Sequence, residues 1–132
     1  MARICVLDDD LDGVTLIQRI LSRKGHLVRV FTDGNEAVRY LLHHRVDLAL
    51  VDSDFGGTGC GLDVLGELKR TEPTLRVIML AQYPTSGLTR QAHEAGAADY
   101  CLKPIEKAAL EQKVSTVLAT GRRHPISQEY HP

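Results

Sequence analysis

Short apolar runs alternate with amphipathic stretches along the whole chain, and this alternation is the strongest constraint on its fold. Asp47–Val51 is almost wholly apolar, as in a strand covered on both faces, whereas Leu27–Phe31 alternates apolar with polar residues, as an edge or half-exposed strand would. Alternating strands and helices predict one parallel sheet with right-handed crossovers and helices on both faces. The predicted strands are Ile4–Leu7, Leu27–Phe31, Asp47–Val51, Leu75–Leu80 and Tyr100–Leu102.

The five segments that follow these strands carry apolar residues at helical spacing. Leu11–Lys24 ends at Gly25, a natural stop for a helix. The next helix starts after the turn at Asp33 and is predicted to bury Ala37, Val38, Leu41 and Leu42. The glycine-rich stretch Phe55–Gly61 is predicted to be loop, and the remaining helices are Leu62–Arg70, Ser86–Ala95 and Ala108–Leu118.

Size and composition fit a single domain. A chain of 132 residues can bury a core of its own. We therefore predict one doubly wound, five-stranded α/β domain of the flavodoxin-like type over residues 1–120. Residues 121–132 lack periodicity and are predicted to form a flexible C-terminal tail.

Charge and cysteine content narrow the function classes. The net charge of −1 gives no electrostatic reason to expect direct nucleic-acid binding or an anionic membrane as partner. No apolar run approaches the roughly 20 residues that span a bilayer, and the first residues lack a signal-peptide pattern. The three cysteines are isolated, which fits a reducing compartment, so we expect the protein to be cytoplasmic.

Charged residues gather where the predicted strands end. Asp8 and Asp9 follow the first strand, Asp52 follows the third, and Lys103-Pro104 follows the last. The carboxyl ends of parallel strands meet at one edge of a sheet, where open α/β sheets bind ligands. The sequence therefore predicts one crevice that holds three carboxylates and an ammonium.

Such a crevice suggests phosphoryl chemistry. Converging aspartates repel one another unless a cation lies among them, and hard oxygen ligands favour Mg²⁺. An aspartate there can attack phosphorus and form an acyl phosphate, with the metal and Lys103 neutralising charge. In the alternative interpretation, the aspartates only cap helices and Lys103 is a surface charge. Any one of these residues alone would favour this alternative, but all of them together, in this order, favour a functional site.

The same motifs resemble the receiver domain of bacterial two-component response regulators. The resemblance covers roughly residues 3–120, nearly the whole chain. It rests on five stretches in matching order and spacing, namely Val6–Asp10, Leu48–Asp52, Gly61–Leu65, Ala95–Tyr100 and Lys103-Pro104.

The resemblance implies a role for each crevice residue. Asp52 would be the phosphoacceptor and Lys103 would contact the phosphoryl group. Asp8 and Asp9 would be the acidic pair that holds Mg²⁺, with Asp9 the more direct ligand. Asp52 and the backbone carbonyl of Asp54 would complete the protein ligands.

The resemblance also implies partners and a switch. The phosphodonor would be a phosphohistidine on a histidine kinase or phosphotransfer protein, and the output would go to a downstream protein or effector domain, with a homodimer possible. Tyr100 matches the aromatic position whose rotamer reports activation, in a surface formed by the last two helices and the last strand. The bond before Pro104 is expected to be cis.

Two departures from the family pattern concern signalling and the loop over the site. The family usually has Ser or Thr after the fourth strand, and counting back from Lys103 places Ala81 there, whose methyl cannot donate a hydrogen bond. Gly56 stands where a proline is common, in a loop that is about one residue longer than usual. Asp54 adds a carboxylate beside the phosphoryl position, where it either alters hydrolysis or is a solvated loop residue.

Two alternative functions follow from these residues. Ala81 and the altered loop motivate a receiver-like binding module that acts without phosphorylation. Asp52-Ser53-Asp54 also satisfies the DxD element of haloacid-dehalogenase-type phosphatases, which would make the chain a metal-dependent enzyme. That class needs its carboxylate pair downstream of the nucleophile, whereas the pair here lies upstream, so this alternative is the weaker one.

Overall fold

A computed structural model describes residues 1–57, 60–83 and 85–120. The predicted tail at 121–132 lies outside these residues. Strands and helices alternate strictly along the described chain. The strands are β1 (Arg3–Leu7), β2 (Leu27–Phe31), β3 (Leu48–Asp52), β4 (Arg76–Ala81) and β5 (Asp99–Leu102). The helices are α1 (Leu11–Arg23), α2 (Gly34–His43), α3 (Gly61–Thr71), α4 (Ser86–Glu94) and α5 (Lys107–Thr120).

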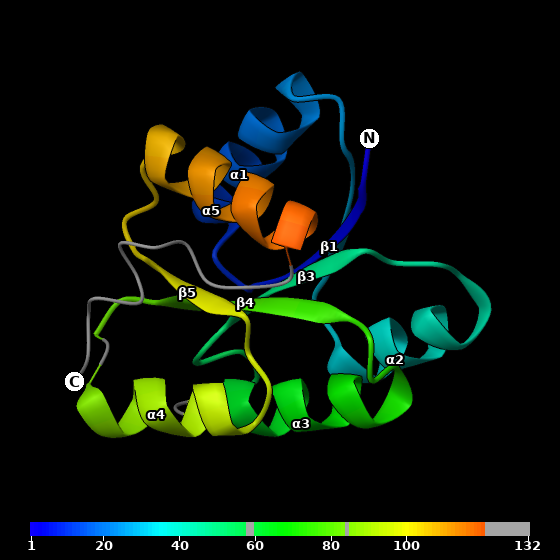
Figure 1. Cartoon of the computed structure of the whole chain (residues 1–132), viewed down its shortest axis with the longest axis vertical. Coiled ribbons are helices and arrows are strands. Elements are labelled where there is room, and N and C mark those ends of the chain that lie inside the picture. Colours follow the sequence, from blue (N-terminus) through cyan, green and yellow to red (C-terminus); the bar gives the residue numbers. More distant parts are fainter. Residues whose placement is uncertain (58–59, 84, 121–132) are drawn as a thin grey trace.

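All strand pairs are parallel, and the sheet has the order β2-β1-β3-β4-β5. In Figure 1, α1 and α5 cover one face of the sheet, while α2, α3 and α4 cover the other. The predicted doubly wound α/β fold is therefore confirmed. The chain winds outward from β1 in both directions, so the crevice rule for open sheets points to the carboxyl ends of β1 and β3.

Two apolar clusters, one on each face, hold the layers together. Val14, Ile17 and Ile20 of α1 pack with Leu110 and Val114 of α5 on one face. Leu65 and Leu68 of α3 pack on the other face, together with Ala37 of α2 and Ala92 of α4. The inner strands are buried on both faces, whereas β2 at the edge has exposed residues, as its alternating sequence predicted.

Two details of the sequence interpretation were wrong. Leu42 is 63% exposed, because it lies one residue further round α2 than Leu41, beyond the face that meets the sheet. Gly61 is the first residue of α3 and does not belong to the loop. Its backbone N–H donates to the carbonyl of Ser53, so the helix begins directly against the end of β3. Among the described residues, no helix is both long and apolar enough to cross a membrane.

Candidate functional site

The sheet brings Asp8, Asp52 and Lys103 together at the carboxyl ends of its strands. Leu7 of β1 pairs with Val51 of β3, so the next residues, Asp8 and Asp52, are neighbours across the two strands. Lys103 follows β5, and its backbone N–H donates to the carbonyl of Ala81 at the end of β4, 2.8 Å away. Register therefore places Asp8 and Asp52 at the point where the winding reverses, and the long side chain of Lys103 reaches them from the end of β5.

Lys103 links the two carboxylates. Its Nζ lies 2.8 Å from Asp8 Oδ2 and 3.5 Å from Asp52 Oδ1. The side chains of Lys103, Asp8 and Asp52 are 14%, 0% and 16% exposed. They border a hollow of about 740 Å³, whose lining also includes Asp10, Asp12, Gly13, Leu16, Ile17, Gln82, Pro104 and Ile105.

Asp8 retains an unfilled acceptor position. Its Oδ1 accepts a hydrogen bond of 2.9 Å from the backbone N–H of Asp10. Its buried Oδ2 has no hydrogen-bond partner among the described residues, although Lys103 Nζ is close. That contact is thus an ion pair without hydrogen-bond alignment, and a buried charged oxygen in this state is costly. The oxygen is therefore suited to a further cationic partner.

The pKa values show the same excess of negative charge. Burial raises the pKa of Asp52 above its usual 3.8, and the charge of Asp8 raises it further, against the lowering effect of Lys103. Burial alone would lower the pKa of Lys103, but its close contacts with the carboxylates of Asp8 and Asp52 raise it overall. One ammonium thus serves two carboxylates and compensates them incompletely.

The carboxylates of the crevice could hold Mg²⁺, but with only a few protein ligands. Asp8 and Asp52 approach the same point, whereas Asp9 and Asp54 are exposed. Within the described ranges no group of three or more His, Cys, Asp or Glu side chains is arranged to hold a metal ion. Mg²⁺ commonly takes only one or two carboxylates and keeps several waters, so the carboxylates of Asp8 and Asp52 are enough to hold it.

Gly61 is a structural requirement of the site that the sequence analysis missed. A Cβ on Gly61 would lie 2.3 Å from the carbonyl oxygen of Asp52 and 2.7 Å from backbone atoms of Ser53. The start of α3 therefore packs directly on the backbone of Asp52 and fixes where its side chain begins. The available signals were a glycine before an apolar helical pattern and the family-like stretch Gly61–Leu65, and neither indicates close packing on Asp52.

The residues predicted to form the switch lie near this end of the sheet. Ala81 is the last residue of β4 and is 3% exposed, so a buried methyl occupies the position. The Lys103-Pro104 peptide bond is cis. Tyr100 lies on edge strand β5, where its half-buried ring has the ammonium of Lys113 5.5 Å from its centroid. The contact with Lys113 was not foreseen from the sequence.

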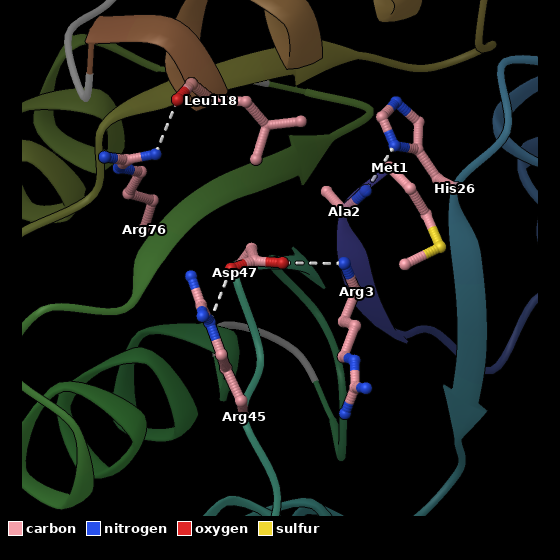
Figure 2. Close-up of a pocket in the computed structure, with 8 residues that line it drawn as sticks. All are labelled: Met1, Ala2, Arg3, His26, Arg45, Asp47, Arg76 and Leu118. Carbon is pink, nitrogen blue, oxygen red and sulfur yellow. Dashed lines mark hydrogen bonds and ion pairs between the residues drawn. The ribbon is translucent and has the colours of Figure 1, made fainter.

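A second hollow, of about 620 Å³, lies at the amino ends of the strands (Figure 2). It is lined by Met1, Ala2, Arg3, His26, Arg45, Asp47, Arg76 and Leu118. Asp47 accepts from the backbone N–H of Arg3 and contacts the exposed Arg45, and Arg76 donates to the carbonyl of Leu118. The charged groups here serve the local backbone, so the crevice at the other end is the better candidate site.

Comparisons with known proteins agree with the fold. Residues 4–115 match the family model of the response regulator receiver domain. The transcriptional regulatory protein ZraR from Klebsiella oxytoca is 29% identical, over 90% of this chain and 27% of its own length. The DNA-binding transcriptional regulator NtrC from Rhizobium meliloti is 30% identical, over 97% of this chain and 26% of its own length.

Solved structures extend the comparison to the fold. A two-component response regulator of the LuxR family from Aurantimonas sp. SI85-9A1 superposes with a TM-score of 0.84 at 27% identity, covering 98% of this chain and 94% of that one. The chain spans about a quarter of the length of the curated relatives it matches.

Proposed function

The chain belongs to the response regulator receiver domain family, and from this premise we propose that it accepts a phosphoryl group on Asp52. The observation that carries the proposal is the position of Lys103 Nζ, 2.8 Å from Asp8 and 3.5 Å from Asp52 in one hollow. Its ammonium can meet the charge of an incoming phosphoryl oxygen while Asp52 attacks.

The proposed reaction transfers a phosphoryl group from the donor to Asp52. A carboxylate oxygen of Asp52 forms a bond to phosphorus, and the bond from phosphorus to the donor breaks, with its electron pair going to the leaving group. For a phosphohistidine on a histidine kinase or phosphotransfer protein, that leaving group is the imidazole nitrogen. The ammonium of Lys103, 3.5 Å from Asp52 Oδ1, favours the ionised carboxylate that makes this attack.

Mg²⁺ is the cofactor that we propose for this step. Asp8, through its unfilled Oδ2, and Asp52 would hold it, with Asp9 and the backbone carbonyl of Asp54 as the further ligands that family resemblance implies. The ion supplies charge neutralisation between the carboxylates and the phosphoryl oxygens. Asp8 gains most, because its buried oxygen has no hydrogen bond within the described residues.

The proposed output is a change in a protein-binding surface around Tyr100 on β5, α4 and α5. The matched relatives are named as transcriptional regulators, and this chain covers only about a quarter of their length. We propose that a downstream protein or effector domain binds this surface. The phosphodonor binds at the crevice, where Asp52 lies. We place this signalling step in the cytoplasm.

Incubation with Mg²⁺ and a small phosphodonor tests acceptance. Intact mass should show one added phosphoryl group in the wild type, and beryllofluoride should bind with Mg²⁺ and shift amide resonances around the crevice. Asp52→Asn should lose both effects, whereas Asp54→Asn, two residues along and exposed, should keep the adduct. An adduct that persists in Asp52→Asn would overturn the assignment of Asp52, as would failure of the wild type to bind beryllofluoride.

The second candidate is a module whose binding surface does not depend on phosphorylation. The buried methyl of Ala81 favours it, because a hydroxyl there could donate to the phosphoryl group with roughly 1.5–3 kcal/mol of stabilisation. Ala81→Ser adds that donor with little extra volume. If beryllofluoride moves Tyr100 only in Ala81→Ser, the second candidate is the native function. Equal responses in both proteins would favour the phosphorylation switch.

A further inference from the structure

Asp99 is a buried carboxylate that the proposed phosphoryl chemistry does not use. Its side chain is 0% exposed, at the start of edge strand β5. Its Oδ1 accepts a 2.7 Å hydrogen bond from the backbone N–H of Tyr100, and its Oδ2 lies 3.6 Å from Lys113 Nζ. A buried carboxylate is strongly unfavourable without a charged partner, so Asp99 holds Lys113 in place.

Lys113 reaches Asp99 from α5. It precedes Val114, one of the residues that α5 buries against the sheet, and its own side chain is only 18% exposed. An ammonium with so little exposure has few positions available. The same Nζ lies 5.5 Å from the centre of the Tyr100 ring, within the range of a cation–π contact.

The three side chains meet around the edge of the sheet. Asp99 pairs with Ile78, which belongs to the cluster under α1 and α5, whereas Tyr100 pairs with Met79, which belongs to the cluster under α3 and α4. Neighbouring residues of a strand point to opposite faces. Lys113 can contact both because β5 is an edge strand, so the long lysine side chain reaches round it to within 5.5 Å of the centre of the Tyr100 ring.

We propose that Lys113, anchored by Asp99, is the positioning residue that holds the Tyr100 ring at the sheet edge. The position of the ring is then set by α5 and this ion pair, and no hydroxyl at position 81 takes part, since Ala81 has none. The inference deepens the proposed function, because it states what controls the surface around Tyr100. The resting position of the ring is independent of any chemistry at Asp52.

The test compares Lys113→Gln with Lys113→Arg, which keeps a cation, and with Lys107→Gln, an exposed lysine of the same helix. The readouts are the ring chemical shifts and χ1 couplings of Tyr100, assigned with Tyr100→Leu. Lys113→Gln removes the cation–π contact. The population of the Tyr100 rotamer that places the ring at the sheet edge should then fall about two- to fivefold relative to the other Tyr100 rotamers. Lys113→Arg and Lys107→Gln should keep wild-type couplings.

A purely structural role for Lys113 predicts a different pattern. Lys113→Gln would then lower the unfolding midpoint and leave the Tyr100 couplings at wild-type values, which would overturn the inference. Adding Mg²⁺ and beryllofluoride separates the two proposals. If neither the wild type nor Lys113→Gln responds around Asp52, the proposed phosphoryl function fails. The inference about Lys113 is judged only by the χ1 couplings of Tyr100 measured without Mg²⁺ and beryllofluoride.

Discussion

The two ends of the sheet carry charges in opposite ways. At the carboxyl ends, Asp8 and Asp52 are nearly or fully buried and share one lysine. At the amino ends, Arg45 has a side chain that is 83% exposed, and Asp47 contacts both it and a backbone N–H. Both ends are hollowed to a similar volume, so size does not distinguish them.

The difference lies in how fully each charge is compensated. The buried oxygen of Asp8 lacks a hydrogen bond within the described chain, and the pKa of Asp52 is raised by burial and by Asp8. Arg76 and Asp47, in contrast, each satisfy a backbone group of a neighbouring segment. Incomplete compensation stores free energy that a ligand can release, which is why chemistry is expected at the carboxyl end.

The largest effect should come from Gly61→Ala. The new Cβ would overlap backbone atoms of Asp52 and Ser53, which cannot move as a side chain could, so the loss should exceed about 3 kcal/mol of unfolding free energy. Gly87 in α4 is the matched control, since nothing lies within 4 Å of its Cβ position. Urea unfolding should show a gain of about 0.5–1 kcal/mol for Gly87→Ala. Similar losses in both variants would contradict the tight packing on Asp52.

Lys103→Met should be next, with a loss of about 3 kcal/mol, because it leaves Asp8 buried without its cation. The corresponding change at the other end, Arg45→Met, removes an exposed partner of Asp47 and should cost less than about 0.5 kcal/mol. Thermal and urea unfolding measure both. Equal losses of unfolding free energy in Lys103→Met and Arg45→Met would contradict the expected difference between a buried and an exposed ion pair.

Asp52→Asn should act in the opposite direction and stabilise the protein by about 1 kcal/mol or less at pH 7. The folded state raises the pKa of Asp52, so its ionised form opposes folding. This penalty is complete above the raised pKa and disappears as pH falls through it toward the usual value of 3.8. Unfolding curves between pH 7 and pH 3 should therefore converge for the two proteins.

Asp47→Ala provides the comparison at the amino end. It removes a carboxylate that accepts from the backbone N–H of Arg3, so it should destabilise the protein by about 1 kcal/mol at neutral pH. The substitutions at Asp52 and Asp47 are thus expected to change the free energy of unfolding in opposite directions. A loss of stability in Asp52→Asn would show that Lys103 compensates Asp52 fully, against the raised pKa.

Much of the fold could be predicted from the sequence, because periodicity reports burial directly. The buried runs at β1, β3 and β4 and the alternating run at β2 indicated these strands and the partial exposure of β2. The proximity of Asp8, Asp52 and Lys103 also followed, since parallel strands place their carboxyl ends together.

What could not be predicted depends on contacts between elements. The exposure of Leu42 depends on how far α2 extends over the sheet, and the role of Gly61 depends on how closely α3 approaches β3. Lys113 is a further example. Its position in an amphipathic helix suggests a solvated lysine, and only the register of β5 shows that Asp99 lies beside it.

The smallest effect is expected for Arg76→Gln at the amino end. Arg76 Nη1 donates to the carbonyl of Leu118 at 2.7 Å, near the end of α5, where helix carbonyls lack partners within the helix. Removing the bond should cost about 0.5–1 kcal/mol and increase hydrogen exchange in the last turn of α5, with Arg90→Gln in α4 as an exposed control. Beryllofluoride binding at Asp52 should be unchanged, because Arg76 lies at the opposite end of β4 from Ala81. A weakened response at Asp52 would mean that the two ends of the sheet are coupled and that the amino end contributes to function as well as to stability.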